Sequence, residues 1–170
     1  VLDPVFLLSV EEWNNFVNRE SYDYVELLKE PYLLIYDFEG NEDIKAFAIE
    51  YAKRNNLKIY AITDKYPLRY ADKNFKTAGP LDFVRLIANS KAFISNSFHG
   101  TAFSVNFGTL FYAVLKPDRG GNARITSLLN SVNLMNRIVY ESDVMPAFSA
   151  FDTDLVQKEI EVLRNDSISF

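Results

Sequence analysis

Apolar runs that alternate with helix-like segments are the feature that most restricts the fold of this chain. Residues Tyr32 to Phe38 form a nearly continuous apolar run, which is typical of a strand buried on both faces of a sheet. A helix-like stretch over 42–55 follows, and 57–62 is a second apolar run. Strands that alternate with helices need crossover connections, and these produce a parallel sheet. We therefore expect a doubly wound, Rossmann-like α/β fold.

The alternation continues to the end of the chain. Ser9 and Glu12 have the spacing of a capping box, which predicts a short helix at this point. Asn41 is expected to cap the helix over 42–55. The segment 63–79 is polar and aperiodic, and it is predicted to be a long connection. The further strands are predicted at 91–95, 109–114 and 137–140, and the further helices from Pro80, over 98–107, from about Asn122 and over 152–164.

Composition limits the classes of protein that this chain can belong to. Its 170 residues, 48% of them apolar, suffice for one domain with a substantial core. A net charge of -5 argues against a nucleic-acid partner, because such proteins usually carry a basic face. The absence of Cys excludes disulfides, and a single His excludes a multi-histidine metal site. A carboxylate metal site stays open as an alternative, but no metal is expected. No apolar run approaches the roughly 20 residues that span a bilayer.

One strand-to-helix turn carries the best candidate site. The strand over 91–95 ends just before Ser97, and the next helix begins within about three residues. A helix N-terminus presents unpaired N–H groups and a partial positive charge, and both favour a phosphate or carboxylate. Gly100 would allow close approach to the backbone, Ser97 and Thr101 can donate hydroxyls, and His99 can bind an anion or transfer a proton. The alternative is that Ser97 only caps the helix and His99 is an ordinary surface residue.

The loop after the following strand is a second source of anion-binding groups. Lys116, Arg119 and Arg124 lie in or next to a glycine-containing loop at the same expected edge of the sheet. Arginine suits phosphate and carboxylate because its guanidinium forms two parallel hydrogen bonds. The alternative is a solvated loop whose cations pair with neighbouring elements. Weaker candidates are Lys73, Lys76, Asp37 and Glu39, and the many Phe and Tyr residues are interpreted as core rather than as a sugar-stacking surface.

Several blocks of the sequence resemble the polysaccharide pyruvyl transferase family. The segment 95–104, which contains Ser97-Phe98-His99-Gly100, resembles the family's signature. The segment 79–90 resembles the helix ahead of that signature, and the start of the chain up to Trp13 resembles the mid-chain of family members. Arg124 falls in a later block, 122–137, and the tail near Ser167 also resembles the family. The order and spacing of these blocks are more specific than the tetrapeptide alone.

This resemblance implies an activity and a set of partners. Members of the family transfer a pyruvyl group from phosphoenolpyruvate to two hydroxyls of a sugar, forming a ketal and releasing phosphate. The resemblance implies a catalytic role for His99. It also implies that the substrate is bound by Ser97, Phe98, Gly100, Thr101, Arg119 and Arg124. Phosphoenolpyruvate would act as donor substrate, so no resident cofactor is expected. The acceptor would be a saccharide of a cell-surface polysaccharide or of its precursor, handled in the cytoplasm.

The resemblance also implies a division of the whole protein. Family members have two Rossmann-like halves in a glycosyltransferase-B-like arrangement, and residues 1–170 correspond to the C-terminal half as a single domain. With the N-terminal half absent, we expect the isolated chain not to turn over, and a homodimer is one way to cover its exposed apolar surface. Two other interpretations remain open: one half of a nucleotide-sugar glycosyltransferase, and a non-catalytic Rossmann-like interaction module.

Overall fold

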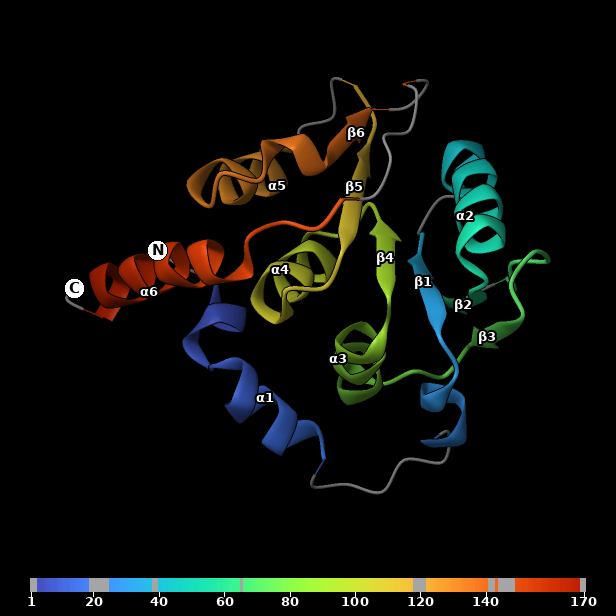
Figure 1. The fold of residues 1–170 in the computed structure, drawn as a ribbon, viewed down its shortest axis with the longest axis horizontal. Helices are drawn as coiled ribbons and strands as arrows, with labels where there is room; N and C mark the ends of the chain where they lie inside the picture. The colour runs from blue at the N-terminus through green and yellow to red at the C-terminus, as the bar shows by residue number, and fades with distance from the viewer. Residues whose placement is uncertain are drawn as a thin grey trace.

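A single parallel sheet organises the molecule. The structure is a computed structural model, and it describes residues 3–18, 25–37, 40–64, 66–117, 122–140, 143 and 149–168. Within these residues six strands pair in the order β3-β2-β1-β4-β5-β6, every neighbouring pair being parallel (Figure 1). The strands are β1 (Tyr32–Tyr36), β2 (Lys58–Ile62), β3 (Lys73–Phe75), β4 (Ala92–Ser95), β5 (Phe111–Leu115) and β6 (Ile138–Tyr140).

Helices cover both faces of this sheet, which confirms the doubly wound, Rossmann-like prediction. The α-helices are α1 (Val10–Val17), α2 (Glu42–Asn55), α3 (Pro80–Asn89), α4 (Phe98–Phe107), α5 (Asn122–Ser131) and α6 (Thr153–Ile168). Helix α2 packs on one face, and α3, α4 and α5 pack on the other (Figure 1). The strand order 3-2-1-4-5-6 places β1 and β4 side by side, which is where the direction of the chain through the sheet reverses.

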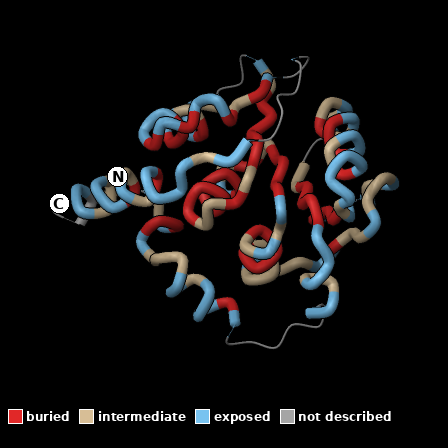
Figure 2. The backbone as a smooth tube through the Cα atoms, in the orientation of Figure 1, coloured by how far each residue is buried: buried red, intermediate tan, exposed pale blue. Residues whose placement is uncertain are grey.

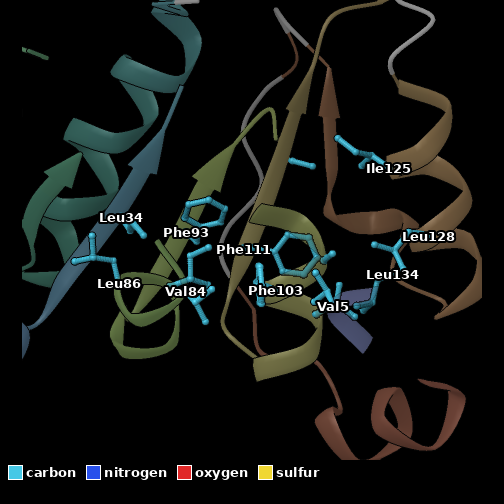
Figure 3. Close-up of a cluster of buried hydrophobic side chains, with 14 of the residues drawn as sticks. Val5, Leu34, Val84, Leu86, Phe93, Phe103, Phe111, Ile125, Leu128 and Leu134 are labelled. Carbon is cyan, nitrogen blue, oxygen red and sulfur yellow. The ribbon is translucent and has the colours of Figure 1, made fainter. Parts of the chain in front are cut away.

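Alternating strand residues build two apolar layers. In β1, Leu34 faces the layer under α3, α4 and α5, whereas Leu33 and Ile35 face α2. Figure 2 shows the strands as the most buried part of the tube, while the outer faces of α1 and α2 are exposed. Figure 3 shows the larger layer, in which Phe93 and Phe111 of the sheet meet side chains from the covering helices. This layer supports the part of the molecule that carries the candidate site.

Local sequence signals set most helix boundaries. The backbone N–H of Ser9 donates to Glu12 at 2.8 Å and the N–H of Glu12 donates to the Ser9 hydroxyl at 3.2 Å, which confirms the predicted capping box. The Asn41 side chain accepts from the amides of Asp43 and Ile44, as expected for the cap of α2. The predicted helices 42–55 and 98–107 coincide with α2 and α4.

The prediction for the long polar connection was wrong at one point. Residues 63–79 contain the short strand β3, which pairs only with β2 at the edge of the sheet. Its middle residue, Asn74, accepts from the amide of Leu68 at 2.8 Å and donates to the Leu68 carbonyl at 3.1 Å. A three-residue edge strand of this polar composition has no apolar run, so periodicity could not reveal it.

The two ends of the described chain pack on the sheet's larger helical layer. Helix α6 contacts α4 and the 3-10 turn η1 (Pro4–Leu7), and Val156 and Ile160 are its buried residues. Arg164 Nε donates to the Phe6 carbonyl at 2.7 Å, and Gln157 donates to the Asn106 carbonyl at 2.7 Å. Among the described helices none is long and apolar enough to cross a membrane.

Candidate anion site and adjoining pocket

The candidate site lies where β1 and β4 end side by side. Ser95 ends β4, and its hydroxyl donates to the Tyr36 carbonyl at 2.5 Å. One residue further, the Asn96 side-chain amide donates to Asp37 at 3.3 Å. Ligands of open α/β sheets bind outside the carboxyl ends of the strands at such a reversal of strand order. The structure therefore puts the predicted Ser97–Thr101 turn at the expected place.

Helix α4 presents a usable N-terminus at this edge. Ser97 is its cap, and the Ser97 hydroxyl accepts from the Gly100 amide at 3.3 Å. Within the described part of the chain, the amides of Phe98 and His99 donate to no acceptor. Free N–H groups and the helix dipole together favour an anion at this position.

Gly100 and Thr101 are buried and hold the helix terminus in place. A Cβ on Gly100 would lie 2.6 Å from Phe93 Cε1, so the glycine lets α4 approach β4 closely. The Thr101 hydroxyl donates to the Ser97 carbonyl at 2.9 Å, and Thr101 is 1% exposed. These contacts give Gly100 and Thr101 a structural role in the turn. Direct contact of either residue with a substrate stays a prediction.

The structure brings Arg124 to the first turn of α4. Its guanidinium carbon lies 3.9 Å from the centroid of the Phe98 ring, a stacked cation–π arrangement. It also pairs with Asp3, with 3.3 Å between Arg124 Nη2 and Asp3 Oδ2. The Arg124 side chain is 62% exposed, so one face of the guanidinium remains open to a ligand. His99 is exposed beside Phe98, with 5.5 Å between their ring centroids.

The structure describes some of the other predicted anion-binding residues and leaves others out. Arg119 and Glu39 lie outside the described residues. Asp37 accepts from the backbone amide of Asn41, the residue that caps α2, at 2.6 Å. Lys73 lies over Phe75 on the edge strand β3, with 5.9 Å from Nζ to the ring centroid. Arg124 is a predicted cation that the structure shows in contact with the α4 turn, through the Phe98 ring.

A pocket of about 590 Å³ opens next to His99 and Ser97. It lies between α1, α3 and α4, and its volume falls within the roughly 300–1,000 Å³ of small-molecule sites. Its described lining residues are mostly apolar: Trp13, Phe16, Tyr36, Ile62, Ala78, Gly79, Pro80, Leu81, Phe83, Val84, Ser97, His99 and Phe103. Sequence reasoning assigned these aromatic residues to the core. The sequence does show an apolar face on the helix that Ser9 caps, but it does not show which residues pack against that face.

The pKa of one tyrosine in the pocket is shifted by its surroundings. Burial raises the pKa of the Tyr36 phenol, with a smaller contribution from the nearby negative charge of Asp64. Tyr36 therefore stays a neutral phenol that can donate and accept hydrogen bonds at neutral pH. Among the residues that the structure describes, no group of three or more His, Asp or Glu side chains could share a metal ion.

The fold and this edge define an α/β domain of the Rossmann type with a helix terminus suited to an anion. The chain belongs to the polysaccharide pyruvyl transferase family, whose model matches residues 1–115. This match includes the Ser97–Thr101 turn and ends before Arg124, so the position of Arg124 rests on the tertiary structure.

The chain was also compared with curated protein sequences and with solved structures. No curated protein sequence matches the chain. Among solved structures, a glycerate dehydrogenase related protein from Thermoplasma acidophilum is similar, with a TM-score of 0.37 and 15% sequence identity. That comparison covers 94% of this chain, which spans 65% of the length of the other protein.

Proposed function

We propose that this chain binds phosphoenolpyruvate at the N-terminus of α4 and takes part in pyruvyl transfer to a saccharide. The observation that supports this most directly is the pair of free amides, those of Phe98 and His99, beside the Arg124 guanidinium. Phosphoenolpyruvate carries a phosphate and a carboxylate. Two free N–H groups at a helix terminus and a planar guanidinium suit these two anionic groups.

The proposed reaction converts an enol phosphate into a ketal. A proton adds to the methylene carbon of phosphoenolpyruvate, and positive charge develops at the neighbouring carbon. One sugar hydroxyl adds to that carbon through its oxygen, and the carbon–oxygen bond to phosphate breaks. A second hydroxyl of the same sugar then closes the ketal. In sum, the two hydroxyls lose two protons, of which one ends on the methyl group and the other leaves with phosphate, so no oxidant or reductant is required.

His99, the free amides of the α4 turn and Arg124 have the main parts in this proposal. His99 binds the phosphate or transfers a proton, since it is exposed at the turn and lines the adjoining pocket. The amides of Phe98 and His99, with Arg124, stabilise the negative charge that develops on the departing phosphate. Arg119 belongs to the same proposal through its place in the loop before α5. The acceptor would belong to a cell-surface polysaccharide or its precursor.

The test is phosphoenolpyruvate binding to this chain by ligand-observed NMR, with His99→Ala and His99→Asn variants. We expect saturable binding that His99→Ala weakens, and His99→Asn separates the two roles because its amide can hydrogen-bond but cannot transfer a proton. In an enzyme that turns over, loss of proton transfer should slow the reaction by about tenfold to a hundredfold or more. Binding that both variants leave unchanged would remove His99 from phosphate binding, and unchanged turnover would remove it from proton transfer.

A nucleoside diphosphate serves as the control ligand. Binding of uridine diphosphate in place of phosphoenolpyruvate would contradict the proposal and favour a nucleotide-sugar glycosyltransferase. Absence of binding by any of these anions to the folded chain would contradict a donor site on this chain and favour an interaction module.

A further inference from the structure

The pocket beside His99 is walled by a continuous series of aromatic rings. In order the series runs Phe16, Trp13, Phe103, Phe83 and Tyr36, and each ring meets the next in an edge-to-face contact. The successive centroid distances are 6.1, 5.0, 6.2 and 5.0 Å. The rings come from α1, α3, α4 and the carboxyl end of β1. The series therefore runs from the surface to the edge of the sheet where the α4 turn lies.

The aromatic wall is held in place before any ligand binds. The Trp13 indole N–H donates to the Val5 carbonyl at 2.8 Å, which fixes the orientation of its ring. The buried Arg85 of α3 donates to the Val17 carbonyl at the end of α1, and its other side is paired with Asp82 at 3.3 Å. Because these contacts attach α1 to its neighbours, the pocket is a formed feature of the fold.

The chemistry of the pocket does not match the donor. Its described lining residues include no Asp, Glu, Lys or Arg, and its polar side chains are Ser97, His99 and Tyr36. Phosphoenolpyruvate is a small, multiply charged anion, and transfer of such charges to an apolar wall without paired groups is costly. The donor therefore belongs at the α4 amides and Arg124, and the aromatic pocket is free for another part of the reaction.

A sugar ring matches the pocket in both of its parts. The C–H groups of one ring face are apolar and pack against the electron-rich faces of aromatic side chains. The hydroxyls at the ring's edge need hydrogen-bonding partners, and Ser97, His99 and Tyr36 are the polar side chains that line the pocket on the side of the sheet edge. Ser97 and His99 lie at the α4 turn and Tyr36 ends strand β1 at the same edge of the sheet, so hydroxyls bound there would face the donor.

We propose that the aromatic pocket between α1, α3 and α4 holds the acceptor sugar, with its reacting hydroxyls toward His99. This inference rests on the proposed function, because it takes the α4 turn as the donor site. It assigns specificity to Trp13 and Phe16, which the family signature around His99 does not include. Phe16 is the outermost ring and is 43% exposed, so it would contact the sugar without supporting the core.

The test compares Phe16→Ala with Ile49→Ala in the whole chain. Ile49 lies on α2, on the opposite face of the sheet, and has the same 43% exposure, so it controls for the loss of an exposed apolar side chain. The probes are methyl β-glucoside and methyl β-galactoside, observed by saturation-transfer NMR with and without phosphoenolpyruvate. We expect saturation at the ring C–H protons, and Phe16→Ala should weaken binding about twofold to tenfold while Ile49→Ala leaves it unchanged.

The outcomes separate this inference from the proposed function. Saccharide binding that Phe16→Ala does not weaken, or that both variants weaken equally, would overturn the acceptor assignment. So would the absence of saccharide binding by a chain that binds phosphoenolpyruvate, since another protein segment would then be the better occupant. Saccharide binding that depends on Phe16, in a chain that does not bind phosphoenolpyruvate, would contradict the donor proposal and leave the pocket assignment in place.

Discussion

Replacement of Gly100 by alanine tests how the α4 turn is built. Gly100 is buried in the first turn of α4, and a Cβ there would lie 2.6 and 2.7 Å from two atoms of the Phe93 ring. Phe93 lies within the larger apolar layer (Figure 3) and is 1% exposed. Because such a layer is closely packed, its ring has little room to move away. The added methyl group should therefore push α4 away from β4 or force Phe93 out of its preferred rotamer.

Two opposing effects determine the size of the loss. Overpacking of a filled core costs about 1–3 kcal/mol. Alanine is favoured over glycine inside a helix by about 1 kcal/mol, which offsets part of that cost. We expect a net loss of about 1–2 kcal/mol in the free energy of unfolding, because these contacts are much shorter than ordinary carbon–carbon distances. For a chain of this size the melting temperature should fall by about 2–8 °C.

The assay is thermal and urea denaturation of Gly100→Ala, Phe93→Leu and the double variant. Phe93→Leu alone loses apolar contacts, but in the double variant the smaller side chain leaves space for the new methyl group. The two changes should therefore cost less together than the sum of their separate costs. A Gly100→Ala variant that melts at the wild-type temperature, or strictly additive costs, would refute the packing argument. Gly100 would then have to be explained by contact with a ligand.

Two further predictions concern single hydroxyl and carboxyl groups. Thr63 and Thr109 are both 8% exposed, but among the described residues the Thr63 hydroxyl has no hydrogen-bond partner, whereas the Thr109 hydroxyl donates to the Ile87 carbonyl at 3.3 Å. Thr109→Val should lower the free energy of unfolding by about 0.5–1.5 kcal/mol, whereas Thr63→Val should leave it unchanged or raise it. Equal losses for the two variants in urea denaturation would contradict this. The Ser9 amide, followed by the Ser9 hydroxyl, lowers the pKa of Glu12 below its ordinary value of 4.5. The Glu12 carboxylate therefore contributes stability above pH 4.5, and this contribution is lost as the pH falls through the lowered pKa. The melting temperature of Glu12→Gln should therefore depend less on pH in this acidic range than that of the wild type.

Local sequence signals determined the helices and most of the strands. The capping boxes and caps at Ser9, Asn41 and Ser97 are satisfied by groups within four residues, so sequence spacing alone predicts them. Buried strands such as β1 and β5 reveal themselves as apolar runs. The parallel sheet then follows from the alternation of strands with helices. The turn at Ser97–Thr101 could be placed at the ligand-binding edge for the same reason.

The edge strand and the arginine side chains could not be predicted in this way. β3 is held by one neighbouring strand and by the Asn74 side chain, so it needs no apolar run of its own. Arg137 was predicted as the first residue of a strand, but it ends a 3-10 turn (Met135–Arg137) just before β6. It is 1% exposed, and its guanidinium carbon lies 5.5 Å from the centroid of the Tyr112 ring and 5.2 Å from that of the Phe151 ring. Such contacts join residues far apart in the chain, and no local pattern records them.

The sequence by itself determined that this chain forms a doubly wound sheet and that the Ser97–Thr101 turn opens a helix at its edge. These features depend on side-chain periodicity and on contacts between near neighbours in the chain. Only the tertiary structure decided that Arg124 stacks on Phe98 and that Trp13 and Phe16 line a pocket beside His99. Those residues sit on elements that are distant in sequence and meet only when the helices pack, because packing is governed by the shapes of whole surfaces.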